Sequence, residues 1–180
     1  PLPQGNTLKS ISFVNETVGY AAGEFGTIIK TTNNGSVWEN ISAQTSNTIN
    51  SVFFIDENIG YAVGDSGLIL KTLNAGVNWS QQISSTNFNL NSVFATDQNN
   101  CWIAGDGGTI LRTENGGLLW IQSTSGINNH LFSIFFVDQY IGWTSGNYGT
   151  ILKTTDSGFS WLQQTSQSND HLYASFFINQ

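Results

Sequence analysis

Three acidic side chains recur at one point of a repeated sequence and are the first candidates for chemistry. Glu24, Asp65 and Asp106 are evenly spaced along the chain, and each has a glycine two residues later. Two carboxyl groups held about 5 to 9 Å apart can serve as acid and base or as nucleophile in glycoside hydrolysis. The same residues suit an Asp-x-Gly turn, and a repeated acid is usually a turn residue. We therefore expect no catalytic residue here and keep glycoside hydrolysis as an alternative.

Two histidines form a second candidate group. His130 and His171 are separated by the same interval as the acidic residues, and Asp170 precedes the second. Adjacent strands could bring the two imidazoles near each other. Two histidines do not make a closed zinc site, which needs further ligands. We expect neither a metal nor another cofactor, and we interpret both residues as loop histidines that could contact a partner.

The charge balance narrows the possible partners. The 180 residues include 12 acidic and 5 basic side chains, for a net charge of −7. So few basic groups cannot neutralise a row of phosphates, which argues against nucleic acid, and they disfavour docking on anionic lipid. No apolar run approaches the ~20 residues of a membrane helix, so we expect no membrane insertion. The low charge with abundant Asn, Ser and Thr favours a secreted or cell-envelope protein.

These candidate residues are positioned by an internal repeat. Four tryptophans recur with a period of ~41 residues, and each closes the phrase Thr-x-Asn/Asp-x-Gly-x-x-Trp. A fixed period of this kind indicates one supersecondary unit that buries its faces on its neighbours. The repeats run over about 8–48, 49–89, 90–130 and 131–171, with a partial copy at 172–180. The structural phrase residues are Asn33, Gly35, Trp38, Asn74, Gly76, Trp79, Asn115, Gly117, Trp120, Asp156, Gly158 and Trp161.

Each repeat reads as four short strands joined by tight turns. In the first repeat we expect strands near 10–14, 18–22, 27–31 and 37–42, recurring with the period of the phrase, with the tryptophan beginning the fourth strand. Several strands are apolar on both faces, which indicates small sheets covered on both sides. The prediction is an all-β fold, a single β-propeller segment over 1–180 with four blades and the first strand of a fifth.

The phrase resembles the Asp-box, or BNR repeat, of sialidase-type propellers, and the fuller pattern is similar to the Ycf48 family. That pattern runs from Phe54-Ile55-Asp56 through Gly60-Tyr61-Ala62 to Trp79 in the second repeat. The resemblance covers residues 8 to 179 and implies a photosystem assembly factor, although the basic patch expected for such a partner is missing. A sialidase would need an arginine cluster, and the chain has only Arg112.

The family resemblance also implies a ring of about seven blades. Residues 172 to 178 repeat only the first strand of a unit. We expect the remaining blades to lie in the same, longer polypeptide, giving seven or eight blades. A second copy that completes the ring is the alternative.

The proposed contact surface is the set of loops that differ between repeats. These are the turns between the second and third strands and the connections between blades, which share one face of a propeller. Phe25, Phe88 and Tyr148 are apolar side chains on this expected surface, the kind of residue that anchors a partner. The candidate binding residues are Glu24, Phe25, Asp65, Phe88, Asp106, His130, Tyr148 and His171.

From these observations we expect a non-catalytic interaction or scaffold module that binds a protein or carbohydrate partner. A photosystem-assembly-factor-like protein is the alternative, and a glycoside hydrolase using channel carboxylates is a further one. The repeat-invariant residues are all explained by packing, so the sequence carries more information about the fold than about the ligand.

Overall fold

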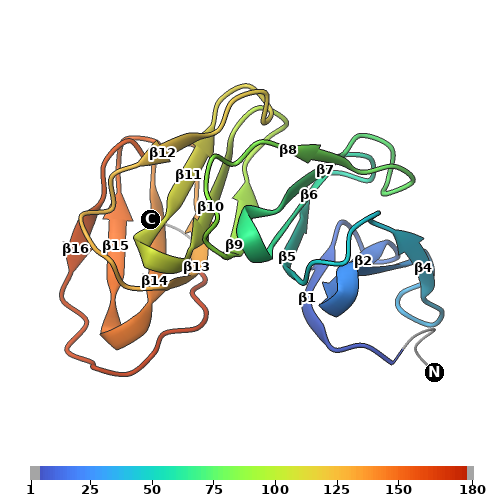
Figure 1. The fold of residues 1–180 in the computed structure, drawn as a ribbon, viewed down its shortest axis with the longest axis horizontal. Helices are drawn as coiled ribbons and strands as arrows, with labels where there is room; N and C mark the ends of the chain where they lie inside the picture. Colours follow the sequence, from blue (N-terminus) through green and yellow to red (C-terminus); the bar gives the residue numbers. More distant parts are fainter. Residues whose placement is uncertain (1–4, 178–180) are drawn as a thin grey trace. The chain divides into compact units, whose positions relative to one another are not determined.

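The structure, a computed structural model, describes residues 5–177. It contains four antiparallel sheets of four strands, each following chain order from one side to the other (Figure 1). The chain divides into two compact units, Pro1–Asn87 (unit 1) and Phe88–Gln180 (unit 2), with two sheets in each. The all-β propeller blades predicted from the repeat are confirmed. None of the described residues forms a helix of the length and apolarity that a membrane span requires.

The strands recur with the sequence repeat. Unit 1 contains β1 (Leu8–Phe13), β2 (Gly19–Gly23), β3 (Thr27–Thr31), β4 (Glu39–Ser42), β5 (Ile49–Phe54), β6 (Gly60–Gly64), β7 (Ile69–Thr72) and β8 (Ser80–Gln82). Unit 2 contains β9 (Leu90–Ala95), β10 (Cys101–Gly105), β11 (Ile110–Thr113), β12 (Ile121–Ser123), β13 (Leu131–Phe136), β14 (Gly142–Gly146), β15 (Ile151–Thr154) and β16 (Leu162–Gln164). One expectation is wrong in detail: each fourth strand begins after the tryptophan, because the phrase up to that ring forms the turn.

The phrase residues build this turn by local hydrogen bonds. In the first blade, Thr31 Oγ1 accepts the Gly35 N–H at 3.0 Å and Asn33 Oδ1 accepts the Val37 N–H at 2.8 Å. Gly35 has φ +80°, in the left-handed region that glycine adopts without strain. The same pair of bonds recurs in the other three blades. Side-chain oxygens therefore accept the backbone N–H groups that have no backbone acceptor in this tight turn.

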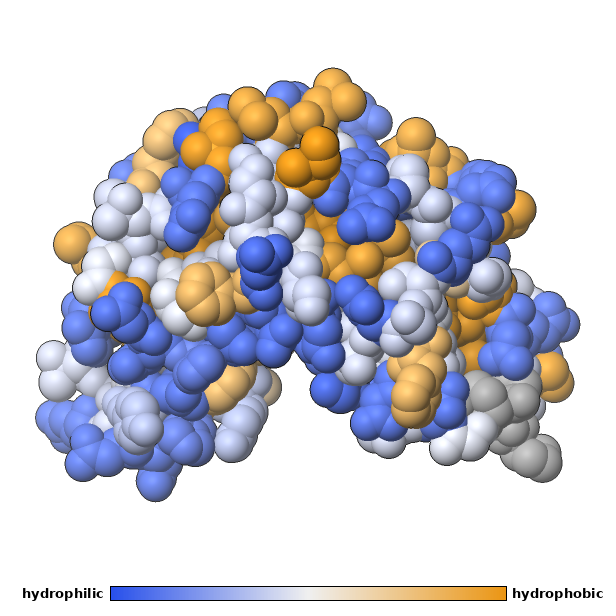
Figure 2. Space-filling model, viewed as in Figure 1, coloured by the Kyte–Doolittle hydropathy of each residue, from blue (hydrophilic) through white to orange (hydrophobic). Residues whose placement is uncertain are grey.

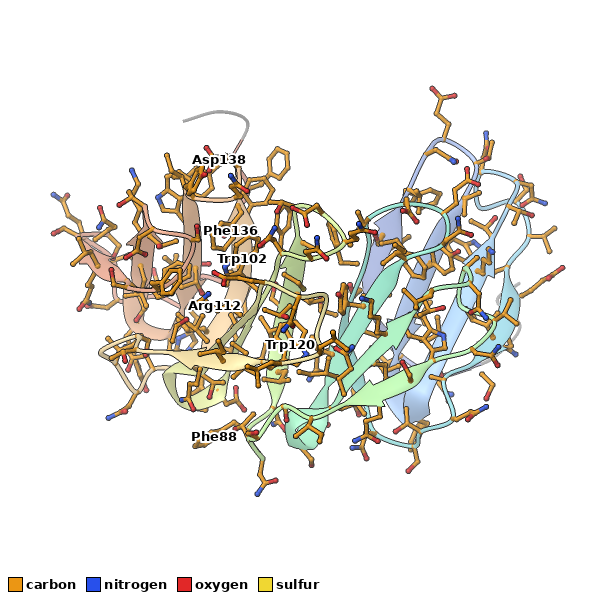
Figure 3. All side chains as sticks on the ribbon, turned by 90° about the horizontal axis from the view of Figure 1, so that it is seen from above. Phe88, Trp102, Arg112, Trp120, Phe136 and Asp138 are labelled. Carbon is orange, nitrogen blue, oxygen red and sulfur yellow. The ribbon has the colours of Figure 1, made fainter. Side chains whose placement is uncertain are left out.

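Aromatic rings fill the space between the two sheets of each unit. In unit 1 the Tyr20 and Phe54 rings stack with centroids 3.5 Å apart, and Trp79 joins the same core. In unit 2 Trp102 stacks on Phe136 at 3.8 Å, and Figure 3 shows these two side chains together. Two of the phrase tryptophans, Trp79 and Trp161, belong to these cores.

Serine hydroxyls join neighbouring inner strands, the first strands of adjacent blades. Ser10 Oγ in β1 accepts the Val52 N–H of β5 at 3.1 Å, and Ser92 Oγ in β9 accepts the Ile134 N–H of β13 at 3.1 Å. The inner strand is the free edge of its sheet, where backbone N–H groups lack a strand partner. The hydroxyl supplies that partner, which explains why serine recurs at this repeat position.

Residues 172–177 contact the last sheet as an inner strand of a following blade would. Phe177 stacks on Trp143 with centroids 4.1 Å apart, and the Ser175 N–H donates to Ser133 Oγ at 3.0 Å. These contacts repeat those of Phe54 and Val52 in unit 1. Residues 172–177 themselves are not in a strand. The expected partial repeat also includes 178–180, which lie outside them.

Candidate functional site

The sheets have two chemically different ends. One end, which we call the box end, carries the turns formed by the Thr-x-Asn/Asp-x-Gly-x-x-Trp phrase. These turns hydrogen-bond to the turns between the first and second strands; for example, the Ala75 N–H donates to Asn58 O at 2.9 Å. The loop end comprises the turns between second and third strands, the connections between blades and the start of each inner strand. In unit 2, Asp138 marks the box end and Phe88 the loop end (Figure 3). Repeat-invariant residues dominate the box end, and the candidate binding residues lie at the loop end.

The turns of the loop end share one backbone design. They are single 3-10 turns, η1 (Glu24–Gly26), η2 (Asp65–Gly67), η3 (Asp106–Gly108) and η4 (Asn147–Gly149). The first residue of each donates its N–H to the carbonyl that precedes the inner strand, as Asp106 does to Asn89 O at 2.8 Å and Asn147 to His130 O at 2.9 Å. The closing glycine has positive φ, and a Cβ there would collide with the carbonyl oxygen of the connection, Thr45 O at Gly26. The backbone is thus fixed independently of the tip residue.

The tip residue of each turn projects from this fixed backbone. Phe25, Ser66, Gly107 and Tyr148 have φ between 54° and 63°. Phe25 and Tyr148, two of the three predicted surface aromatics, are 70% and 65% exposed. Bulky residues rarely adopt this left-handed conformation, and such strain concentrates at functional positions.

Polar side chains form a chain at the loop end of unit 1. Lys9 Nζ donates to Asn50 Oδ1 at 3.1 Å, and Asn50 Nδ2 donates to Asp65 Oδ1 at 2.9 Å. The candidate acid Asp65 is therefore tied to the inner strand by an amide, and the lysine lies at the far side of that amide. Glu24 is only partly buried at the equivalent position of the first blade.

Asp106 is held in a similar way in unit 2, with a histidine added. Its Oδ1 accepts Asn91 Nδ2 at 2.8 Å and lies 2.8 Å from His130 Nδ1. Asn91 Nδ2 also reaches the Leu131 carbonyl at 2.9 Å, which ties the group to the start of β13. The structure thus joins two of the predicted site residues, Asp106 and His130, through a charge-assisted contact when the imidazole is protonated.

Four rings form a second group at the loop end of unit 2, and we call Phe132, Tyr148, His171 and Tyr173 the aromatic cluster. Phe132 and Tyr173 stack with centroids 5.0 Å apart. His171 makes edge contacts with Tyr148 at 5.4 Å and Tyr173 at 6.0 Å. The Tyr148 N–H also donates to His171 Nδ1 at 3.4 Å. Tyr173 is 67% exposed, leaving much of the cluster open to a partner.

The two histidines therefore have separate roles. His130 contacts Asp106, whereas His171 contacts Tyr148 and Tyr173. Among the described residues no group of three or more His, Cys, Asp or Glu is placed to hold a metal ion.

Phe88 is exposed at the surface of unit 2 but supported by the adjacent turn. Its side chain is 55% exposed, and a Cβ built at Gly107 would lie 3.2 Å from its ring. The missing side chain of Gly107 leaves room for the Phe88 ring against η3. Sequence alone marks Phe88 as a surface aromatic but does not reveal this support.

A polar hollow lies beside the turn in three of the blades. Their volumes are about 570 Å³ at Ser66, 510 Å³ at Gly107 and 670 Å³ at Tyr148. Glutamine, serine, threonine and asparagine side chains predominate in their linings. The third hollow differs because Tyr148 of the aromatic cluster forms part of its wall, next to Gln163, Gln164 and Asn169.

The basic side chains of unit 2 are engaged away from the aromatic cluster. Arg112 is buried, with its guanidinium 3.4 Å from the centre of the Phe159 ring and Nη1 2.6 Å from Glu114 Oε1. Lys153 Nζ lies 5.0 Å from the Trp143 ring centre. Glu114 and Phe159 belong to phrase turns, so this arginine serves the box end. Surface colouring shows polar residues interspersed with separate hydrophobic patches (Figure 2).

Clear pKa shifts occur in scaffold turns and in a core tyrosine. Burial, followed by the charge of Glu57, raises the pKa of Tyr20 to about 12, so its hydroxyl stays a donor to Ala75 O. Burial acts to raise the pKa of Asp156, but hydrogen bonds from Ser160, Thr154 and the Phe159 backbone lower it on balance. Burial likewise acts to raise the pKa of Asp97, and hydrogen bonds led by that from the Asn100 side chain lower it on balance.

The sequence prediction missed part of this site. Asn50, Asn91, Phe132 and Tyr173 share one repeat position with Lys9, at the start of the inner strands. Their signal was the change of residue type at a fixed repeat position, from lysine through asparagine to aromatic. That signal resembles ordinary loop variation until the structure shows that these side chains contact Asp65, Asp106 and His171.

Comparisons with known proteins agree with this architecture. The sequence model of the family described as Photosynthesis system II assembly factor YCF48 matches residues 1–86, 31–124 and 80–155. No curated protein sequence matches the chain. Similar solved structures include YCF48 bound to D1 peptide, at TM-score 0.77 and 20% identity over 96% of this chain and 58% of that one.

Two further structures show the same fold. YCF48 from Cyanidioschyzon merolae has a TM-score of 0.76 and 20% identity, covering 99% of this chain and 62% of its own. The GH74 xyloglucanase from Xanthomonas campestris has a TM-score of 0.73 and 12% identity, covering 94% and 32%. The chain thus spans about three fifths of the YCF48 structures and a third of the xyloglucanase. Because the family match extends over most of the repeats, the chain belongs to the Photosynthesis system II assembly factor YCF48 family.

Proposed function

We propose that this chain is a non-catalytic module of the assembly-factor type, which binds an extended peptide segment of a partner protein at its loop end. The family match is the observation that carries this proposal. A structural neighbour, YCF48 bound to D1 peptide, supports a peptide as the ligand class. We favour this assembly-factor role over a general scaffold role. We also propose that the protein lies in the cell envelope or outside the cell.

The chemistry of the loop end supports binding without catalysis. Asp65 accepts a bond from Asn50, and Asp106 accepts one from Asn91 while contacting His130. These contacts occupy carboxylate oxygens and tie both acids to the inner strands, as in a structural turn. Both acids therefore fit a binding surface better than the acid–base pair of a glycoside hydrolase.

The contrast between the two ends of the sheets supports the loop end as the contact surface. Side chains at the box end repeat from blade to blade and complete the turns. At the loop end the backbone repeats, while the exposed side chains change from Phe25 to Ser66, Gly107 and Tyr148. A specific contact surface requires such differences, because identical side chains would present the same chemistry in every blade.

The test is binding of the purified chain to an array of short peptides of random composition, with the D1 peptide included. We expect a subset to bind and their affinities, measured by fluorescence anisotropy, to lie in the micromolar range, about 10⁻⁶ to 10⁻⁴ M, typical of exposed peptide grooves. Binding should be saturable and should be competed by unlabelled peptide. The Leu118→Ser variant, altered at the exposed box end, serves as the control and should bind equally.

Two outcomes would contradict the proposal. If no peptide binds the folded chain, a peptide-binding role is excluded. If xyloglucan oligosaccharides are cleaved and Asp65→Asn or Asp106→Asn abolishes cleavage, the hydrolase alternative replaces it. The second measurement is needed because a GH74 enzyme shares the fold.

A further inference from the structure

We infer that the loop end of unit 2 selects peptide segments that carry a lysine or arginine side chain. The inference rests on the proposed function and specifies its ligand. The cationic group would lie against the exposed tyrosines of the aromatic cluster. Three features of the structure carry this assignment: the rings, the charges and the adjoining polar hollow.

The rings are arranged as a supported platform. His171 contacts the edges or faces of three neighbours, Tyr148, Tyr173 and Phe132, with centroids 5.4, 6.0 and 6.5 Å away. Tyr148 and Tyr173 remain about two thirds exposed despite these contacts. An exposed tyrosine face attracts a cation within about 6 Å of its centre. Because packing already orients the rings, a ligand would lose little side-chain freedom of the protein on binding.

Charge at this surface favours a cation over an anion. Asp106 contacts His130. Asp170 precedes His171, and its backbone carbonyl accepts the Gly149 N–H at 2.7 Å. Unit 2 contains two residues of the Lys and Arg type, and both contact rings elsewhere, Arg112 at Phe159 and Lys153 at Trp143. A peptide carboxylate would therefore meet no lysine or arginine in the aromatic cluster, whereas a lysine or arginine of the peptide would meet exposed ring faces in a unit whose acidic side chains outnumber its basic ones.

The hollow beside Tyr148 gives the peptide backbone hydrogen-bond partners. Gln163, Gln164 and Asn169 line it, and its volume of about 670 Å³ makes it the largest of the three equivalent hollows described. Amide side chains can both donate to and accept from an extended main chain. Tyr148 belongs both to this wall and to the aromatic cluster, so one peptide can contact the two together.

Unit 1 provides a natural negative control. Phe25 occupies the repeat position of Tyr148 and is equally exposed, yet Lys9 occupies the position of Phe132. The Lys9 ammonium group donates to Asn50 Oδ1, so the loop end of unit 1 already contains a cation. That charge would repel a lysine or arginine of the ligand.

The experiment uses the peptides that bind in the array. Binders should be enriched in Lys and Arg, and replacing that residue by Gln should weaken binding by about tenfold, the loss expected for a partly desolvated cation–ring contact. Replacement by Glu should weaken it further. Raising the ionic strength from about 0.05 to about 0.5 M should also weaken binding to the cationic peptide, because the exposed charges are screened.

The repeat itself supplies variants that should fold. Tyr148→Ser introduces the residue found at position 66, and Tyr173→Asn introduces that found at positions 50 and 91. Either change should weaken a Lys-containing peptide by about fivefold to tenfold. Phe25→Ser makes the same change in the same turn of unit 1 and should weaken this peptide less than Tyr148→Ser does. Leu118→Ser, at the exposed box end, is the control that should leave the affinity unchanged. Thermal unfolding of each variant checks that its sheets are intact.

The outcomes separate this inference from the proposed function. Binders without a Lys or Arg preference would overturn the cationic ligand while leaving peptide binding established. Equal losses in Tyr148→Ser and Phe25→Ser would overturn the assignment to unit 2. A preference for acidic peptides would contradict the charge argument. Complete absence of binders would overturn both proposals.

Discussion

Lys9 and Phe132 occupy the same place in the repeat, at the start of an inner strand, but they have different neighbours. Lys9 in unit 1 bonds to Asn50, which bonds to Asp65. Phe132 in unit 2 stacks on Tyr173 and contacts His171. One backbone position thus carries a polar chain in one unit and an aromatic cluster in the other.

This difference is tolerated because other residues maintain the backbone. The turn beside each position is fixed by a backbone bond, Asp65 N–H to Thr48 O in unit 1 and Asn147 N–H to His130 O in unit 2. Its closing glycine, Gly67 or Gly149, has positive φ in both. The side chain at the inner-strand position does not contribute to either constraint, so it can change without altering the fold. Variation at this end is therefore available for recognition.

The largest effect should come from the shared aromatic core, and it should be equal in the two units. Trp79→Ala or Trp161→Ala should lower the free energy of unfolding by ~3 to 5 kcal/mol, because each removes a buried ring from between two sheets. Trp120→Ala should act similarly, since that ring is 5% exposed. Trp38→Ala should cost less, because Trp38 is only partly buried. Denaturant unfolding measures all four; an unchanged Trp79→Ala would refute the packing role.

The phrase glycines should be next in effect. Gly76→Val forces a β-branched side chain into φ +82°, and its Cβ would approach Ile41 Cδ1 at 2.7 Å. We expect a loss of about 2 to 3 kcal/mol. Gly158→Val, at φ +79° and near the Trp102 indole, should lose a similar amount. If thermal melts give widely different stability losses for Gly76→Val and Gly158→Val, the phrase turns of the two units are not structurally equivalent.

The serine bonds between inner strands should have a smaller effect, again similar in each unit. Ser10→Ala and Ser92→Ala remove the hydroxyls that accept the Val52 and Ile134 N–H groups. Since Val52 and Ile134 are buried, each lost bond should cost ~1 to 3 kcal/mol. Amide hydrogen exchange should quicken at Val52 or Ile134 in the matching variant. Unchanged exchange at both would mean that water replaces the hydroxyl.

The units should differ in their response to acid. Asp156 stands where the other three phrases have asparagine, and hydrogen bonds lower its pKa although partial desolvation acts to raise it. A lowered folded-state pKa adds stability above the unfolded value, and this stability is lost as pH falls through the folded one. Unit 2 should therefore lose stability below about pH 4 through Asp156, a loss that Asp156→Asn removes. Thermal melts of the unmodified chain and of the Asp156→Asn variant from about pH 7 to about pH 3 test this. If the melting temperatures of the two proteins fall in parallel with pH, Asp156 makes no contribution.

Most of the fold was predictable from sequence because its determinants are local. Asn33, Gly35 and their repeats form bonds and backbone conformations within one turn, so a fixed spacing reveals them. The start of β4 was misplaced because Trp38 closes the turn and precedes the strand. Side-chain periodicity does not distinguish these two positions.

The candidate site was less predictable because its contacts join distant parts of the chain. Asp106 follows β10 whereas His130 precedes β13, and Phe132 and Tyr173 lie one full repeat apart. Their proximity depends on how successive inner strands lie side by side. Sequence identified His130, Tyr148 and His171 as candidate contact residues, but only the three-dimensional structure shows that Phe132 and Tyr173 contact His171.

The smallest expected effect bears most directly on the comparison of the loop ends. Phe25 and Tyr148 both hold a bulky side chain at positive φ, which asparagine adopts more readily. Phe25→Asn should therefore stabilise the chain by up to about 1 kcal/mol. Tyr148→Asn gains the same relief but loses the ring contact with His171, worth about 0.5 to 1.5 kcal/mol, so its net change should be near zero or unfavourable. The gap between the two variants in chemical denaturation thus measures the coupling within the aromatic cluster. If adding His171→Asn leaves that gap unchanged, the cluster is not energetically coupled, and the exposed tyrosine is no more constrained than the exposed phenylalanine of unit 1.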